Sequence, residues 1–138
     1  MLSLPMRAPR IIRVFIADDS AALREHVLEL IQDIPGVNIV GFASEATQAV
    51  ASIRQLKPDV VLLDIQLPHG SGLDVLRSIK QNGRGPLTIV ATNFPYPQYR
   101  KRALDLGADY FLDKTTDIEE LRGLITQLTG GLQPAGTN

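Results

Sequence analysis

The stretch VVLLDIQLPHGSG, residues 60–72, contains the pattern that decides the fold. The four apolar residues at 60–63 have the continuous apolar character of a strand that is covered on both faces. Asp64 follows them without a polar transition, and Ser71 then offers an N-cap for a helix that we predict over 71–83. A buried strand that ends in a carboxylate and leads into a helix is typical of a parallel sheet whose strand ends line a polar crevice.

The same alternation of an apolar strand and an amphipathic helix repeats along the chain. The strands are predicted at residues 11–17, 37–43, 59–63, 86–91 and 109–112. The helices are predicted at residues 20–34, 44–56, 71–83, 97–107 and 116–130. Residues that favour helix ends accompany them, namely Ser44, the pair Asn82–Gly83, Pro97 with Gly107, and Thr116 with Glu119 at capping-box spacing.

Five units of this kind favour an α/β fold with one doubly wound, five-stranded parallel sheet. Right-handed connections leave the flavodoxin-like strand order 2-1-3-4-5 as the natural arrangement. We expect a single domain over residues 11–130, with an N-terminal tail at 1–10 and a C-terminal tail at 131–138.

The composition of the 138 residues excludes several classes of protein. A net charge of −1 argues against a direct nucleic-acid binder, and the lack of cysteine excludes a disulfide scaffold and a thiolate zinc site. The N-terminal apolar run is too short for a signal peptide, and no run approaches the roughly 20 residues that span a bilayer. We therefore expect a cytoplasmic protein that binds neither nucleic acid nor membrane.

Polar residues follow the strands of this predicted sheet at the points where the strands end. Asp18 and Asp19 follow the first strand, and Asp64 follows the third. Thr92 and Lys114 come at the ends of the fourth and fifth strands. In a sheet of this order, ligands bind beyond the carboxyl ends of the strands, at the switch point between the first and third. We therefore expect these side chains to meet in one open, polar crevice.

Carboxylates that share one crevice repel one another unless positive charge offsets them. A divalent cation and the Lys114 ammonium would together balance the three carboxylates. Because the ligands are hard oxygens without His or Cys, they favour Mg²⁺, with Mn²⁺ as the alternative. Without metal, removal of Asp18 or Asp19 is expected to leave the stability unchanged or higher. Such a crevice suits phosphoryl transfer, with one carboxylate as the nucleophile.

Four short motifs at fixed spacing connect these residues with a known family. They are ADDS at 17–20, LLDIQLPHGSG at 62–72, VATN at 90–93 and GADYFLDK at 107–114. As a set, they resemble the receiver domain of the response regulators of two-component signalling systems, over residues 11–130. The resemblance implies a signalling switch that is controlled by phosphorylation.

The resemblance implies a role for each acidic residue of the crevice. Asp64 would accept a phosphoryl group from a sensor histidine kinase or a phosphotransfer protein. The same carboxylate would share Mg²⁺ with Asp19, which would bind the ion directly, and with Asp18, which would bind it through water. The backbone carbonyl of Gln66 would be a further ligand.

The other matched positions concern the phosphoryl group and the switch. Thr92 would form a hydrogen bond with the phosphoryl group, and Lys114 would pair with it. Phe111 falls at the family's switch aromatic position but lacks the hydroxyl of the more usual tyrosine. Thr115 stands where the family usually has a proline, which leaves the shape of the last loop open, and Asn93 replaces the more usual alanine.

Two classes of function follow from these residues. The first is a stand-alone receiver that binds a downstream protein target and can form a homodimer. Its chemistry would be limited to self-phosphotransfer and slow autodephosphorylation, so it would not be an enzyme. The second is a Mg²⁺-dependent phosphatase with an aspartate nucleophile on the same fold. Such enzymes usually carry an acid two residues after the nucleophile, where Gln66 stands. The basic segment at 96–102, which contains two tyrosines, is interpreted as a docking face for a protein partner.

Overall fold

A computed structural model describes residues 11–81 and 84–130 of the chain. The two predicted tails, 1–10 and 131–138, and the predicted helix stop at 82–83 lie outside the described residues. Within the part that is described, no helix is long and apolar enough to cross a membrane.

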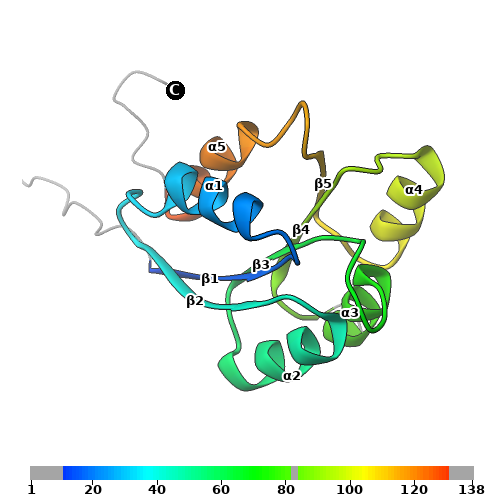
Figure 1. Cartoon of the computed structure of the whole chain (residues 1–138). Helices are drawn as coiled ribbons and strands as arrows, with labels where there is room; N and C mark the ends of the chain where they lie inside the picture. The colour runs from blue at the N-terminus through cyan, green and yellow to red at the C-terminus, as the bar shows by residue number, and fades with distance from the viewer. Residues whose placement is uncertain (1–10, 82–83, 131–138) are drawn as a thin grey trace, which may run out of the picture.

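Five parallel strands form one sheet in the order β2-β1-β3-β4-β5, which confirms the predicted α/β, doubly wound, flavodoxin-like fold (Figure 1). The strands are β1 (Ile12–Ala17), β2 (Val37–Ala43), β3 (Val60–Leu63), β4 (Leu87–Thr92) and β5 (Tyr110–Asp113). The helices are α1 (Ala21–Ile31), α2 (Ala46–Leu56), α3 (Gly72–Ile79), α4 (Pro97–Asp105) and α5 (Glu120–Leu128). The ends of these elements differ from the predicted ends by at most four residues.

The helices cover both faces of the sheet, with α1 and α5 on one face and α2, α3 and α4 on the other (Figure 1). The side chains of β3 alternate between the two cores. Val60 and Leu62 belong to the core under α1 and α5, whereas Val61 and Leu63 belong to the core under the other three helices. Because both faces of this strand are dry, its sequence is a continuous apolar run instead of an alternating one.

Three predicted helix ends are present in the structure. The side chain of Ser71 accepts the backbone N–H of Asp74 at 3.2 Å and caps α3. Pro97 is the first residue of α4, where its missing N–H removes no helical hydrogen bond. Gly107 follows this helix with a φ of 107°, a conformation that favours glycine.

The predicted N-cap of α2 is wrong. Glu45, not Ser44, holds the cap position, and its side chain makes no cap hydrogen bond. The N–H of Ala46, the first helical residue, donates instead to the carbonyl of Pro68 at 3.0 Å. A backbone acceptor from a distant loop therefore replaces the side-chain cap.

The predicted capping box of the last helix is also wrong. Residues 114–119 form turns, and α5 begins one residue after Glu119. The hydroxyl of Thr116 donates to the carboxylate of Asp117 at 3.1 Å and caps no helix. Turn residues therefore occupy the positions where the capping box predicted the first turn of this helix.

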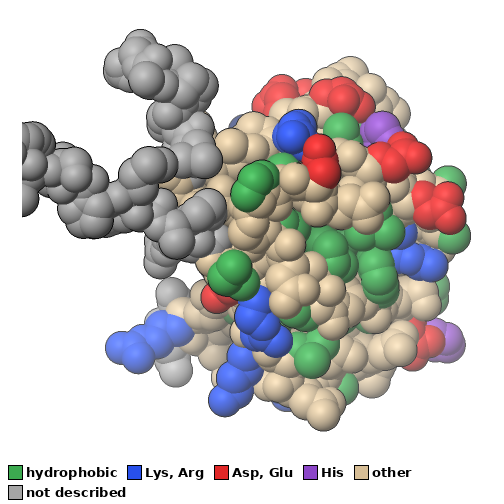
Figure 2. Space-filling view, turned by 90° about the vertical axis from the view of Figure 1, so that its left-hand side faces the viewer, with side chains coloured by type: hydrophobic (Ala, Val, Ile, Leu, Met, Phe, Trp, Pro, Cys, Tyr) green, Lys and Arg blue, Asp and Glu red, His purple; other side chains and the backbone are tan. Residues whose placement is uncertain are grey.

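The edge strand β2 carries one extra residue relative to its neighbour β1. Val14 pairs with Ile39, whereas Phe15 pairs with Gly41, so Val40 is the additional residue of a β-bulge. Figure 2 views the molecule from the side on which β2 lies and shows hydrophobic side chains gathered in the middle of that surface.

Candidate functional site

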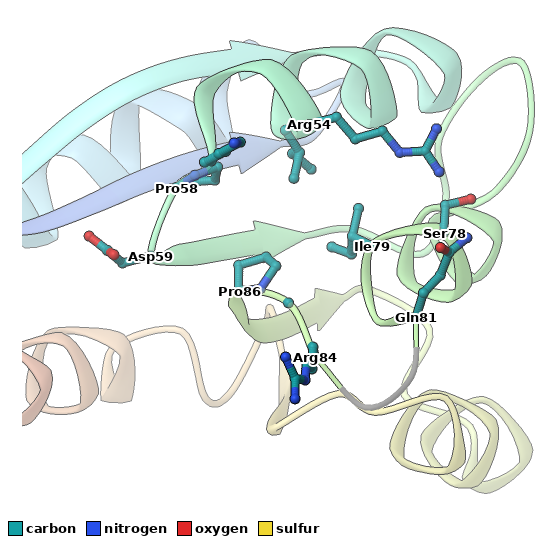
Figure 3. Close-up of a pocket in the computed structure, with 11 residues that line it drawn as sticks. Arg54, Pro58, Asp59, Ser78, Ile79, Gln81, Arg84 and Pro86 are labelled. Carbon is teal, nitrogen blue, oxygen red and sulfur yellow. The ribbon is translucent and has the colours of Figure 1, made fainter.

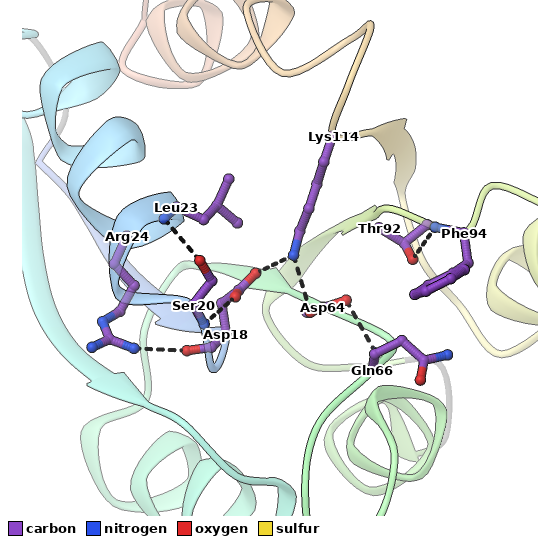
Figure 4. A network of polar contacts seen from close by, with 9 residues as sticks. All are labelled: Asp18, Ser20, Leu23, Arg24, Asp64, Gln66, Thr92, Phe94 and Lys114. Carbon is purple, nitrogen blue, oxygen red and sulfur yellow. Dashed lines mark hydrogen bonds and ion pairs between the residues drawn. The ribbon is translucent and has the colours of Figure 1, made fainter.

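The carboxyl ends of the strands bring the predicted site residues to one edge of the sheet (Figure 4). The last residues of β1 and β3 are in register, so Asp18 and Asp64 leave adjacent strands at the same level. Thr92 is the last residue of β4, and its carbonyl accepts the backbone N–H of Lys114 at 2.9 Å. Residues that are far apart in the sequence therefore meet because parallel strands end together.

Lys114 joins two of the carboxylates. Its Nζ lies 2.6 Å from Oδ2 of Asp18 and 3.0 Å from Oδ2 of Asp64. The exposed fractions of Lys114, Asp18 and Asp64 are only 9%, 2% and 5%. The expectation of an open crevice is therefore wrong for these three residues. One ammonium stabilises two desolvated carboxylates at once, which allows them to lie beneath the surface.

Burial governs the ionisation of Asp64. Loss of solvent raises the pKa of its carboxyl, while the Gln66 backbone N–H and the Lys114 ammonium act in the opposite direction. The Gln66 N–H donates to Oδ1 of Asp64 at 3.0 Å, and Lys114 contacts the other carboxylate oxygen. The ionised form therefore gains more from an added cation than a solvated carboxylate would.

Two residues that sequence reasoning did not assign to the site hold Asp18 in place. Its Oδ1 accepts the backbone N–H of Ser20 at 2.8 Å, and its carbonyl accepts the guanidinium of Arg24 at 2.9 Å. The Arg24 guanidinium also lies over the Phe42 ring, 5.8 Å from its centroid. Ser20 caps α1 through the N–H of Leu23, a role that a serine before an apolar helix could have indicated. No sequence signal pointed to Arg24.

Carboxylate oxygens of Asp18, Asp19 and Asp64 all lie within 4.8 Å of one another. Asp19 is exposed, whereas the other two are buried. Such a set of hard oxygen donors, without nitrogen or sulfur, fits Mg²⁺ or Mn²⁺. The role of the Gln66 carbonyl at this site stays a prediction.

Asp18 and Asp19 are not equivalent in the absence of metal. Loss of the Asp18 carboxylate would deprive the buried Lys114 ammonium and the Ser20 N–H of a partner. We therefore restrict the expectation of an unchanged or higher stability to the removal of Asp19, where it stays a prediction.

The loop that follows Asp64 requires a residue without a side chain at position 72. The N–H of Gly72 donates to the carbonyl of Ile65 at 2.7 Å. A Cβ at this position would lie 2.0 Å from the backbone oxygen of Asp64. Gly72 therefore allows the start of α3 to pack directly against the backbone of the site.

The two predicted switch residues contact groups outside the carboxylate cluster. Thr92 is wholly buried, and its hydroxyl accepts the backbone N–H of Phe94 at 3.0 Å. Phe111 is 8% exposed and belongs to the core under α2, α3 and α4. The guanidinium of Arg100 lies 5.6 Å from the centroid of the Phe111 ring, within the range of a cation–π interaction. Arg100 therefore links α4 to β5 over this ring.

Side chains close the loop after Lys114, where the resembling family usually has a proline. The Asp113 carboxylate accepts the N–H of Thr115 at 2.8 Å and its hydroxyl at 2.6 Å. The Asp117 carboxylate accepts the N–H of Asp113 at 2.9 Å. The hydrogen bonds from Thr115 lower the pKa of Asp113. Every peptide bond between described residues is trans.

The fold is a doubly wound domain in which the adjacent strands β1 and β3 bring Asp18, Asp19 and Asp64 to the switch point of the sheet. Lys114, which follows the last strand in the sequence, reaches the same point. The sequence model of the response regulator receiver domain matches residues 14–126. The chain therefore belongs to the response regulator receiver domain family.

Relatives with curated descriptions contain this domain as part of longer proteins. A protein-glutamate methylesterase/protein-glutamine glutaminase from Methanospirillum hungatei is 40% identical over 113 residues, which cover 80% of this chain and 33% of that protein. The uncharacterized transcriptional regulatory protein YvfU from Bacillus subtilis is 32% identical over 120 residues, which cover 87% of this chain and 60% of that protein. The chain thus spans about a third of the first relative and less than two thirds of the second.

Solved structures share the fold over most of their length. The response regulator domain of Thermotoga maritima CheB is 27% identical, with a TM-score of 0.76 over 88% of this chain and 95% of that one. A DNA-binding response regulator of the LuxR family from Staphylococcus aureus is 30% identical, with a TM-score of 0.77 over 86% of this chain and 98% of that one.

Proposed function

We propose that the chain is a phosphorylation-controlled signalling switch in which Asp64 accepts a phosphoryl group in a Mg²⁺-dependent reaction. The observation that supports this most is the pairing of the buried Lys114 with both Asp18 and Asp64, in a chain of the receiver family. The ammonium already faces the Asp64 carboxylate, so it is placed to offset the charge of an arriving phosphoryl group.

In the proposed reaction, an oxygen of Asp64 attacks the phosphorus of a phosphohistidine. An O–P bond forms, the P–N bond of the donor breaks, and the imidazole leaves with the electron pair. Lys114 exchanges part of its contact with the carboxylate for a contact with the phosphoryl oxygens. Thr92, at the end of the neighbouring strand β4, donates its hydroxyl to the same oxygens.

Asp18, Asp19 and Asp64 would hold the Mg²⁺, or Mn²⁺ in its place, together with the backbone carbonyl of Gln66. A bound divalent cation supplies positive charge against the phosphoryl oxygens. One oxygen of Asp18 and one of Asp64 contact Lys114 in this structure. These two carboxylates would have to give up part of their contact with Lys114 to bind the ion, whereas the exposed Asp19 would not.

The switch would run from Thr92 into the loop before α4. The Thr92 hydroxyl accepts the N–H of Phe94, so a movement of Thr92 toward a phosphoryl group would change the start of this loop. Phe94 and Tyr96 are 41% and 51% exposed, and Arg100 covers the ring of Phe111. A downstream protein target would bind the surface that these residues form in the phosphorylated state.

The phosphoryl donor would be a sensor histidine kinase or a phosphotransfer protein. Beyond self-phosphotransfer and slow loss of the phosphoryl group, we propose no enzymatic turnover for this chain. The match to the methylesterase covers 33% of that protein, and we carry over only the regulatory role of the matched part. A homodimer and a cytoplasmic location stay predictions.

Intact-mass measurement after incubation with a small acyl phosphate tests the proposal. With Mg²⁺ the protein should gain one phosphoryl group, and with EDTA it should gain none. A phosphatase would instead release many equivalents of inorganic phosphate without keeping one, which a parallel phosphate assay detects. Covalent uptake that is equally fast in EDTA would contradict the role of the carboxylate cluster.

A further inference from the structure

A cavity of about 490 Å³ lies at the amino ends of β3 and β4, whereas Asp64 follows the carboxyl end of β3. Figure 3 shows the residues that line it. The last turns of α2 and α3 and the residues that precede β3 and β4 form its walls. From Asp59 to Asp64 the chain advances about 16 Å along the strand direction, at about 3.3 Å per residue. The cavity is therefore separate from the proposed phosphorylation site.

The floor of this cavity is apolar and preformed. Ile53 and Ile79 line it from the two helices and are 3% and 8% exposed. Pro58 and Pro86 line it from the segments before β3 and β4, which are adjacent strands. Such rigid apolar walls, with a few polar groups at the rim, are typical of small-molecule sites of this size.

The rim of the cavity has an excess of positive charge in a chain whose net charge is −1. Arg54, Lys57 and Arg84 line it and are exposed, and no ion pair to them is found among the described residues. Asp59 is the acidic residue among the lining residues, and its carboxylate accepts the backbone N–H of Arg13 at 2.8 Å. The rim therefore favours an anionic ligand.

Cations at a helix C-terminus often serve only to offset the helix dipole. At the end of α2 the Arg13 side chain already fills that role. Its guanidinium donates to the carbonyls of Leu56 and Lys57 at 2.7 and 2.8 Å. The side chains of Arg54 and Lys57 are therefore not needed as caps and are available to a ligand.

We propose that this cavity binds a nucleoside monophosphate, with the base against the apolar floor and the phosphate against Arg54. In Figure 3 Arg54 extends from α2 toward the side of the cavity where Ser78 and Gln81 lie. A guanidinium with a hydroxyl and an amide nearby supplies charge-assisted and neutral hydrogen bonds to a phosphate. A planar base gains most from an uncharged, rigid apolar surface.

Titration of the 138-residue chain with AMP, GMP, CMP and UMP in EDTA, followed by amide NMR shifts, tests this assignment. EDTA removes metal-dependent binding at the Asp64 end. At least one nucleotide should cause saturable shifts centred on residues 53–59 and 78–81, with a Kd below about 1 mM. The matching nucleoside should bind roughly tenfold more weakly, a loss of about 1.4 kcal/mol.

The variant Arg54→Gln should weaken nucleotide binding by roughly tenfold and leave nucleoside binding unchanged. Arg77→Gln is the matched control, since Arg77 is an exposed arginine on α3 that pairs with Asp74 outside the lining of the cavity. The proposal is overturned if none of the four nucleotides saturates, if the shifts centre on the Asp64 edge, or if inorganic phosphate alone binds as tightly. An equal loss in the Arg77 control would overturn it as well.

Discussion

Charged side chains near the two ends of β3 lie in opposite environments. At the carboxyl end, Asp64 and Asp18 are buried and share the ammonium of Lys114. At the amino end, Arg54 and Lys57 are exposed and form no ion pair with the residues that the structure describes. Buried side chains therefore form ion pairs at one end of this strand, whereas exposed side chains are solvated by water at the other end.

This difference decides what a ligand has to do at each end. At the carboxyl end, a cation or a phosphoryl group must replace contacts that already hold the structure together, so binding is coupled to rearrangement. At the amino end, a ligand adds contacts to solvated groups and leaves the core as it is. Substitutions at the two ends should therefore differ in chemistry, in stability and in pH dependence.

Exchange of Asp64 for Asn gives the largest expected contrast. Asp64→Asn should abolish covalent phosphoryl uptake, because an amide is not a nucleophile. The matched change at the other end of the strand, Asp59→Asn, should leave uptake at the parent level. Intact mass after incubation with an acyl phosphate and Mg²⁺ measures both. Uptake by Asp64→Asn at the parent rate would show that another residue is the acceptor.

Removal of the shared ammonium should have the largest effect on stability. Lys114→Met leaves two buried carboxylates without their cation, so the free energy of unfolding at neutral pH should fall by about 3–5 kcal/mol. Lys57→Met, at the exposed end, should change it by less than about 0.5 kcal/mol. Urea unfolding in EDTA compares the two variants. Similar small losses would remove the distinction between the two ends.

Substitutions of the neighbouring acids Asp18 and Asp19 should affect Mg²⁺ binding and metal-free stability to different extents. Asp19→Asn should weaken Mg²⁺ binding by at least about tenfold and more than Asp18→Asn does, with little change in metal-free stability. Asp18→Asn should lower the metal-free stability by about 1–3 kcal/mol, because Lys114 and the Ser20 N–H lose a charged partner. Calorimetric Mg²⁺ titration and urea unfolding give the two quantities. The reverse order of Mg²⁺ affinities would reject Asp19 as the direct ligand.

The raised pKa of Asp64 predicts a pH dependence in the absence of metal. Since burial raises this pKa on folding, the folded state binds the proton more tightly than the unfolded state does. The contribution of Asp64 therefore favours folding at low pH and declines as the pH rises through the raised pKa. Relative to Asp64→Asn, the parent should lose stability from about pH 4 upward.

Urea unfolding in EDTA over a pH series checks this difference. Asp59→Asn serves as the control, because Asp59 is exposed and its replacement should not remove the pH dependence that Asp64 causes. A parent that gains stability relative to Asp64→Asn with rising pH would mean that the Lys114 pairing outweighs burial.

The smallest expected effect concerns the lifetime of the phosphoryl group. Asn93 and Gln66 are exposed residues that follow β4 and β3 at the edge of the site. Asn93→Ala should open a path for water and shorten the lifetime severalfold, while Gln66→Ala has the lesser effect. The decay of purified phosphorylated protein in Mg²⁺ measures this. A longer lifetime in Asn93→Ala would instead mean that the amide positions the attacking water.

The order of the strands could be predicted because each strand and its helix is a local unit with its own apolar pattern. The edge of the site could be predicted too, since Asp18, Asp64 and Lys114 all follow the ends of apolar runs and parallel strands end together. Membership in the receiver family was anticipated by the same spacing, and the match over residues 14–126 confirms it.

Features that depend on distant partners could not be predicted. The meeting of Asp64 and Lys114, fifty positions apart, was expected from the strand ends, but their burial follows from packing that no local pattern records. Ser44 failed as a cap because the carbonyl of Pro68, from another loop, satisfies the helix N–H. Arg24 was missed because its target is a backbone carbonyl, which every residue offers.

The bulge at Val40 has a consequence for association between molecules. β2 is an edge strand with the sequence VNIVGFA, and none of its residues carries a charge that would repel a strand from another molecule. The additional residue interrupts the regular row of N–H and C=O groups that a growing intermolecular sheet would need. We therefore expect this one inserted residue to hinder edge-to-edge association, as lysine residues do at the edges of many other sheets.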